Sequence, residues 1–285
     1  SPLILDHSGN GKFLADSLSY ISGLKYQPAT LNGKPVPSNQ FLFLQHTINS
    51  GRDLNKSAGT RFAEHYGEAL KLIANNKLDE SQAAINGLKE DFTKNLARKS
   101  WIAWLSAMLN FRQQDYDNYL RNLVIASSLA EDYLSNKVVA KLYMNLFEMQ
   151  MYANRYVDAS LTLNKMKDSE KVTVDDDLYK SLLERVTQQL AGESAFSVKI
   201  AMMGDKWQYY RVHRPQLHLN WQAGTLSGLK LRCPASVNDY LQNIDSERQS
   251  MTLETVEKDC VLLVQGKRGS QLNIKVDALV GNSQK

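Results

Sequence analysis

The residues that could act as ligands, bases or nucleophiles are few and scattered. The five histidines are His7, His46, His65, His213 and His218. Only His213 and His218 lie close in sequence, and Pro215 between them predicts a bend, which disfavours a metal pair there. Neither a Gly-x-Ser-x-Gly elbow nor a phosphate-cradling glycine loop is present. The sequence therefore favours a non-enzymatic protein with no metal and no cofactor.

Three consecutive acidic residues, Asp175, Asp176 and Asp177, have the look of a calcium ligand set. They stand directly before a segment with helical apolar spacing. Acidic residues at that position cap the helix and complement its dipole, which is the better explanation here. We therefore expect a helix start rather than a metal site.

The two cysteines lie in one carboxy-terminal segment, Cys233 at the end of the strand-like run 228–233 and Cys260 at the start of 260–265. No histidine or further cysteine stands at zinc-ligand spacing. A disulfide is favoured, and closing residues 233–260 would stabilise the fold by about 3.6 kcal/mol in the chain-entropy model. Such a bond persists in an oxidising compartment such as the periplasm. The alternative is two buried free thiols.

Length and composition bound the architecture. A chain of 285 residues holds two or three domains, and 43% hydrophobic with 22% charged residues is ordinary for a globular protein. The net charge is only +4 and the basic residues are dispersed, which argues against nucleic-acid binding. No apolar stretch is long enough to cross a bilayer.

The region 61–192 predicts a helical domain, because apolar residues recur there at three- and four-residue spacing and proline is absent. The predicted helices are 62–74, 78–88, 96–111, 116–129, 138–152, 156–166 and 178–190. A polar turn followed by Leu or Tyr and an acidic residue recurs at Leu78, Tyr116 and Tyr156, with offsets of 38 and 40 residues (78 to 116, 116 to 156).

This recurring block resembles the turn of the tetratricopeptide repeat (TPR), whose standard period is about 34 residues. Small residues expected nine positions before the turn aromatic are Ala69 and Ala107, with Phe147 as an exception. Those expected three positions after it are Ser81 and Ala159, with Tyr119 as the exception. The resemblance implies a short α-solenoid of helix pairs. Aromatic residues in the second and third repeats pack its core or line a groove for a partner: Trp101, Trp104, Phe111, Tyr116, Tyr119, Tyr143, Phe147 and Tyr152.

In the region 194–280, apolar residues recur at every second position in short runs. This pattern predicts an antiparallel β-sandwich or barrel. The predicted strands are 196–202, 207–212, 216–220, 228–233, 251–255, 260–265 and 272–276.

The amino-terminal region has a distinctive order. A short amphipathic helix at 13–22 is followed by Leu24-Lys25-Tyr26-Gln27-Pro28-Ala29, then by Asn32-Gly33-Lys34-Pro35-Val36, then by the apolar run 41–48. Asn32-Gly33 predicts a left-handed turn between two extended segments. The residues that carry this pattern are Tyr26, Pro28, Asn32, Gly33 and Pro35.

These blocks, at this spacing, resemble the second half of the carboxy-terminal domain of TonB-type energy transducers, over about a sixth of the chain. Leu24 stands where many members carry Trp. The resemblance implies an inner-membrane-anchored periplasmic protein that couples inner-membrane motor proteins to outer-membrane TonB-dependent receptors. It also implies that a receptor peptide adds as a strand to the terminal strand of the domain. That edge strand would comprise Gln40, Phe41, Leu42, Phe43, Leu44, Gln45 and His46.

The family's membrane anchor, Pro-rich spacer and first half-domain find no match in these residues, so we expect them upstream, or the unit is a relic. An unpaired edge could also pair with a second copy of the chain, giving a homodimer.

The predicted organisation is multi-domain α+β: a partial TonB-like unit (1–48), a linker (49–60), TPR-like repeats (61–192) and a β-sandwich (194–280). Two alternatives stay open. One is a periplasmic TPR scaffold without transduction activity. The other is a cell-wall or carbohydrate-binding module with Trp207, Tyr209, Tyr210 and Trp221 as stacking residues.

The disulfide is directly testable by thiol titration of the purified, oxidised protein after denaturation without reductant. We expect no reactive thiol, and two after reduction. Two thiols before reduction would contradict both the bond and the inference of an oxidising compartment.

Overall fold

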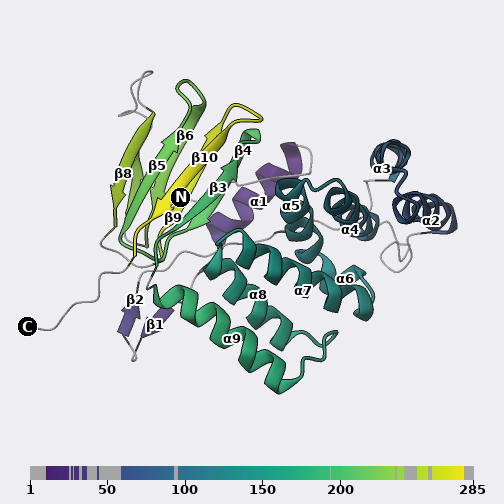
Figure 1. The fold of residues 1–285 in the computed structure, drawn as a ribbon, viewed down its shortest axis with the longest axis horizontal. Coiled ribbons are helices and arrows are strands. Elements are labelled where there is room, and N and C mark those ends of the chain that lie inside the picture. The colour runs from purple at the N-terminus through teal and green to yellow at the C-terminus, as the bar shows by residue number, and fades with distance from the viewer. Residues whose placement is uncertain are drawn as a thin grey trace, which may run out of the picture. The chain divides into compact units, whose positions relative to one another are not determined.

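The computed structural model (Figure 1) describes a mixed α and β chain. The described residues are 11–25, 27, 29–31, 34–36, 44, 59–92, 96–192, 194–234, 236–240, 249–255 and 259–278. Contacts divide the chain into two units. The sheet unit comprises residues 1–46, 153–157 and 187–285, and the helical unit comprises 47–152 and 158–186.

The helices after residue 59 follow the predicted segments closely. They are α2 (Thr60–Ala74), α3 (Leu78–Phe92), α4 (Leu96–Arg112), α5 (Tyr116–Ser127), α6 (Ala130–Tyr133), α7 (Asn136–Tyr152), α8 (Tyr156–Asp168) and α9 (Asp176–Ala191). Only the four-residue α6 was not predicted. The Asp175 carboxylate accepts hydrogen bonds from the backbone N–H groups of Asp177 and Leu178, so the acidic cluster caps α9 as expected.

Three connections of equal length join the helix pairs α2–α3, α4–α5 and α7–α8. In each, one residue adopts a left-handed conformation: Asn76 (φ 60°), Gln114 (φ 57°) and Asn154 (φ 56°). The backbone N–H of the next residue donates to a carbonyl in the last turn of the preceding helix. Examples are the 2.9 Å bonds from Lys77 N to Leu72 O and from Asp115 N to Asn110 O. The internal periodicity seen in the sequence therefore corresponds to a repeated turn geometry.

The positions at which the repeat pattern expects small residues are buried. Ala69 and Ala107 are fully buried, and so is Phe147 at the equivalent position. The second set of positions is also buried, in the order Ser81, Tyr119 and Ala159. These positions are therefore buried whatever the size of the residue, and the two large residues, Phe147 and Tyr119, are buried as well.

The sheet unit contains two four-stranded antiparallel sheets (Figure 1). The first has the order β3 (Phe196–Ala201), β10 (Gln271–Val276), β5 (Gln216–Trp221), β8 (Ser250–Glu254). The second has the order β4 (Gly204–Arg211), β9 (Val261–Gly266), β6 (Leu226–Arg232), β7 (Val237–Asp239). Alternate residues of both sheets, such as Leu219, Leu229 and Leu262, belong to one hydrophobic cluster.

Cys233 and Cys260 form a disulfide with an S–S distance of 2.02 Å. Cys233 directly follows β6 and Cys260 directly precedes β9, next to the paired residues Arg232 and Val261. The bond therefore joins two neighbouring strands of one sheet, and the predicted pairing is confirmed.

The amino-terminal region has a helix followed by a hairpin. Helix α1 (Gly11–Gly23) leads to β1 (Ala29–Leu31) and β2 (Lys34–Val36). These strands pair antiparallel, with Ala29 opposite Val36 and Leu31 opposite Lys34. The turn predicted at Asn32-Gly33 lies outside the described residues.

Overpacking tests the repeat register. Replacing the fully buried Ala107 with Trp should destabilise the protein by about 1–3 kcal/mol, because no space exists for the ring. Arg112→Trp, at an exposed position of the same helix, is the control and should have little effect. Equal urea midpoints for wild type and Ala107→Trp would show that the register is wrong.

Candidate functional site

Most residues of the proposed strand-addition edge lie outside the described part of the chain. This holds for Gln40, Phe41, Leu42, Phe43, Gln45 and His46, and for Tyr26, Pro28, Asn32 and Gly33 of the family pattern. Leu44 is described, half-buried and outside the named strands. Pro35 lies in β2 opposite Thr30. The edge strand therefore remains a prediction.

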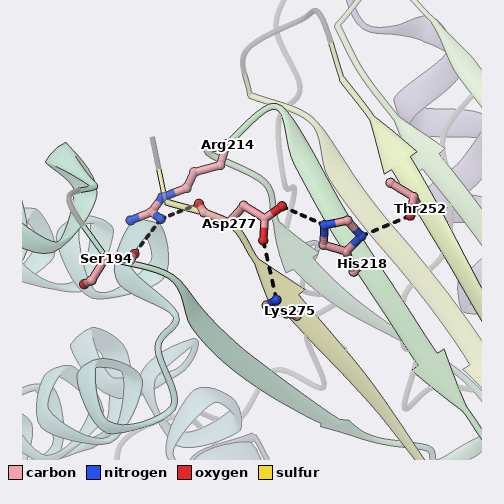
Figure 2. Close-up of polar contacts among 6 residues, drawn as sticks. All are labelled: Ser194, Arg214, His218, Thr252, Lys275 and Asp277. Carbon is pink, nitrogen blue, oxygen red and sulfur yellow. Dashed lines mark hydrogen bonds and ion pairs between the residues drawn. The ribbon is translucent and has the colours of Figure 1, made fainter. Parts of the chain in front are cut away.

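Figure 2 shows a polar network at the end of the first sheet. The His218 ring contacts Thr252 Oγ1 through Nδ1 at 3.0 Å and Asp277 Oδ2 through Nε2 at 2.6 Å. Lys275 Nζ lies 4.0 Å from the other Asp277 oxygen. A hydroxyl, an imidazole and a carboxylate in this order could in principle activate a nucleophile.

The register of the strands explains this arrangement without catalysis. Thr252 lies directly opposite His218 in the β5–β8 pairing, so their contact follows from the ladder. Asp277 directly follows β10, the other neighbour of β5. Both ring nitrogens contact neighbouring strands, and the network joins three strands of one sheet. The sequence pattern does not connect these residues, because their proximity depends on the strand register.

Arg214 connects the end of α9 to the sheets. Its Nη1 donates to the Ser194 and Asp277 carbonyl oxygens at 2.8 and 2.6 Å (Figure 2). Its Nη2 donates to the Gln189 carbonyl at 3.3 Å. The side chain is almost fully buried, and these three carbonyls compensate for the lost hydration at Nη1 and Nη2, while Nε is buried without a hydrogen-bond partner. The arrangement is structural, since all three partners are main-chain oxygens.

His213 lies in the sheet unit among partners different from those of His218. Its ring stacks on Phe196, with centroids 5.6 Å apart and planes 9° apart, and it contacts Tyr156 edge-on. Burial, with the neighbouring Arg214 charge as a further cause, lowers the pKa of His213 to about 4. The rings of His213 and His218 thus contact different sets of partners.

The aromatic residues proposed as a carbohydrate-stacking surface do not form one. Tyr210 and Trp221 are buried in the core of the sheet unit. The Trp207 ring lies against Gly228, with Lys230 Nζ 5.6 Å from its centroid. Arg155 occupies a face of Tyr209, 4.7 Å from its centroid. Core packing therefore accounts for Tyr210 and Trp221.

The aromatic residues of the helical unit divide between core and surface. Trp104, Tyr119, Tyr143 and Phe147 are buried, as the packing interpretation predicted. Phe111, Tyr116 and Tyr152 are exposed, and the rings of Tyr116 and Tyr152 lie 5.9 Å apart. These three exposed residues could contact a partner protein, because aromatic side chains are enriched at interfaces.

A polar cavity of about 210 Å³ lies among α3, α4 and α5. Its lining residues are Gln82, Ile85, Lys89, Ser106, Leu109, Asn110, Asn118, Arg121 and Asn122. The two charged residues are both cationic, and neutral amides and a hydroxyl surround them. The side-chain amide groups of its lining already donate to other side chains of the protein: Gln82, Asn110, Asn118 and Asn122.

Two further findings bear on function. Within the described ranges, no group of three or more His, Cys, Asp or Glu residues could hold a metal ion, and no helix is both long and apolar enough to cross a membrane. No protein-family model and no curated protein matches this chain.

Acid titration tests the environment of His213. A histidine with a pKa of about 6.5 when unfolded and about 4 when folded binds its proton more tightly in the unfolded chain. Stability is therefore complete above pH 6.5 and falls as the pH approaches 4. Between pH 7 and pH 5 the loss should be about 2 kcal/mol. Of the neighbouring groups, Arg214, Tyr156 and Tyr210 keep their charge states over this range.

The test compares urea unfolding of wild type and His213→Phe at pH 7 and pH 5. The variant should lose about 2 kcal/mol less between these pH values, because the phenyl ring keeps the stacking and cannot take up a proton. His65→Phe makes the same substitution at an exposed position and is the control. A His213→Phe variant with the acid sensitivity of wild type would contradict the assignment.

Proposed function

We propose that this chain is part of a TonB-type energy transducer of a Gram-negative envelope, acting through protein–protein contacts and without enzymatic chemistry. The observation that carries the proposal is the order of elements in the amino-terminal region. A helix, α1, precedes an antiparallel hairpin with Ala29 opposite Val36, as the resemblance implies for residues 11–36.

The chemistry of α1 is consistent with that role. Leu14, Leu18 and Ile21 form a half-buried stripe, while Asp16 and Tyr20 are exposed. A helix of 13 residues gains most of its stability from packing an apolar face onto other elements. In the transducer domain, the surface that it covers is the small sheet to which the receptor peptide adds.

The proposed compartment is the periplasm. The Cys233–Cys260 disulfide supports it, because such bonds persist in oxidising compartments and are rare in the reducing cytosol. Anchoring at the inner membrane, contact with the motor proteins and contact with a receptor belong to the same proposal.

A second candidate function is favoured by the helical unit. Its helix pairs expose Phe111, Tyr116 and Tyr152, and a scaffold of TPR type uses such surfaces to hold a partner. On this alternative, the amino-terminal unit is a cap and strand addition has no role. The two functions predict different binding segments, and mutation can separate them.

Substitutions of Phe43 distinguish the transducer function from the scaffold function. Phe43→Pro removes an N–H and distorts a strand, whereas Phe43→Leu preserves the ladder. The probe is a panel of synthetic peptides from periplasm-facing segments of outer-membrane receptors, titrated against the protein with its upstream sequence. The transducer function predicts that Phe43→Pro weakens binding about tenfold or more and Phe43→Leu little.

The disulfide and the circular dichroism of both variants verify folding. Equal binding by both variants would reject strand addition and leave the scaffold as the better explanation. Loss of binding on replacing the exposed Tyr152 with Ser, with Phe43→Pro unaffected, would favour the scaffold directly.

A further inference from the structure

The connection between α7 and α8 differs from the other two connections in what its last residue contacts. In the first connection, Lys77 pairs with Glu80 in the first turn of α3, with 3.1 Å between nitrogen and oxygen. In the second, the Asp115 carboxylate accepts a 3.2 Å bond from the Asn118 N–H and caps α5. In the third, the residue before α8 is Arg155, whose side chain has no acceptor and cannot cap a helix.

The third connection instead binds the backbone of two strands. Among the described residues, β3 is an end strand of the first sheet and β4 is an end strand of the second. Asn154 Nδ2 donates to the Ser197 carbonyl of β3 at 2.8 Å, and Arg155 Nη2 donates to the Tyr209 carbonyl of β4 at 3.0 Å. Residues 153–157 belong to the sheet unit, so both contacts lie within one unit. One short connection thus contacts the edges of both sheets.

The strand register shows that both carbonyls point away from the neighbouring strand. At the end of β4, the Val212 N–H donates to the Cys260 carbonyl beside β9 at 2.8 Å. Backbone groups alternate in direction along a strand, so those of Tyr209 point away from β9. The Ser197 carbonyl points away from β10 by the same alternation, counted from the bond of the Met202 N–H to the residue before β10. Such outward groups are the ones that an additional strand would bind.

Neighbouring side chains hold both donors in place. The Tyr156 hydroxyl donates to Asn154 Oδ1 at 2.6 Å, which orients the amide so that Nδ2 faces β3. The Tyr156 ring is buried and lies edge-on to Phe196, with 5.0 Å between the centroids. The Arg155 guanidinium lies 4.7 Å from the ring centroid of Tyr209, so it covers the residue whose carbonyl it binds.

The edge of β4 is complementary to a second copy of itself. Tyr209 and Arg211 are its outward-facing residues, and Trp207 is next in the alternation. When two copies pair antiparallel about Tyr209, the two tyrosines face one another and each Trp207 faces the Arg211 of the other copy. These pairs are favourable, because aromatic rings pack across strands and a guanidinium is attracted to an indole face. A second copy of the chain therefore fits this edge once the edge is open.

We propose that Asn154 and Arg155 form a cap that keeps the β3 and β4 edges from pairing with a second copy of the chain. With the cap in place, an outward carbonyl of each edge is already bound, and the Arg155 side chain lies where an added strand would bind. Removing the cap opens the β4 edge to antiparallel pairing in a two-fold dimer. This edge is distinct from residues 40–48, so the inference does not depend on the transducer proposal.

Substitutions in the third connection remove the cap and retain the helix pair. Asn154→Gly keeps a left-handed conformation (φ 56°) that glycine adopts readily, and it removes the amide donor. Arg155→Ser removes the guanidinium and supplies a hydroxyl that can cap α8. In sedimentation equilibrium, the dimer dissociation constant of the double variant should be at least about tenfold lower than that of wild type. The control, Asn76→Gly with Lys77→Ser, makes the equivalent changes in the first connection and should match wild type.

Two further measurements locate the interface. Adding Tyr209→Pro to the double variant removes an N–H that points away from β9, so it should abolish the gain in association and preserve the β4–β9 ladder. In the double variant, the Arg211 amide should exchange at least about tenfold more slowly at dimerising than at dilute concentration. The Tyr210 amide, which already faces β9, should not change. Circular dichroism and the intact disulfide verify folding, and Arg155→Ser alone repeats the test if the double variant does not fold.

Three outcomes would overturn the proposal. Equal dimer dissociation constants for the folded variants and wild type would show that the cap does not prevent pairing. Stronger association that persists after Tyr209→Pro would place the interface away from the β4 edge. Slower exchange confined to residues 40–48 would show that two copies pair through that segment instead. The binding of receptor peptides is measured separately with the Phe43 variants, so failure of the cap proposal is distinguishable from failure of the transducer proposal.

Discussion

Three connections of equal length, 75–77, 113–115 and 153–155, constrain the helical part of this protein. Each contains one residue with a left-handed backbone conformation. Each connection ends one helix and returns the chain so that the next helix packs against it. The register of each pair then determines which side chains are buried, including Ala69 and Ala107. It also places the polar faces of α3 and α5 beside α4.

The sheet unit is held by interactions of a different kind. Its two sheets share a hydrophobic cluster, and a disulfide joins neighbouring strands β6 and β9. Within this unit, the third connection contributes directly, because Asn154 Nδ2 donates to the Ser197 carbonyl and Arg155 Nη2 to the Tyr209 carbonyl. Arg214 joins the end of α9 to the same region. All of these contacts are made to main-chain oxygens.

Sequence periodicity predicted the long elements well, since an amphipathic helix or strand repeats its pattern over several turns or residue pairs. It missed α6, whose four residues are too few to show a period, and β7, whose three residues are all exposed. The disulfide was predictable because both cysteines occupied strand-like runs. The cavity was not, because Lys89 and Arg121 occupy polar helix positions that are ordinarily solvated. Their convergence depends on tertiary packing, as do the Thr252–His218 contact and the burial of His213.

The proposed transducer function depends on residues 40–48 accepting a receptor peptide as an additional strand. Amide hydrogen exchange of these residues, with and without a saturating receptor peptide, tests this most directly. Strand addition predicts that every second amide from 40 to 48 exchanges at least about tenfold more slowly in the complex, because only alternate N–H groups face a new neighbour. Unchanged exchange throughout 40–48, with new protection confined to the helical unit, would contradict strand addition and identify the helical repeats as the binding surface.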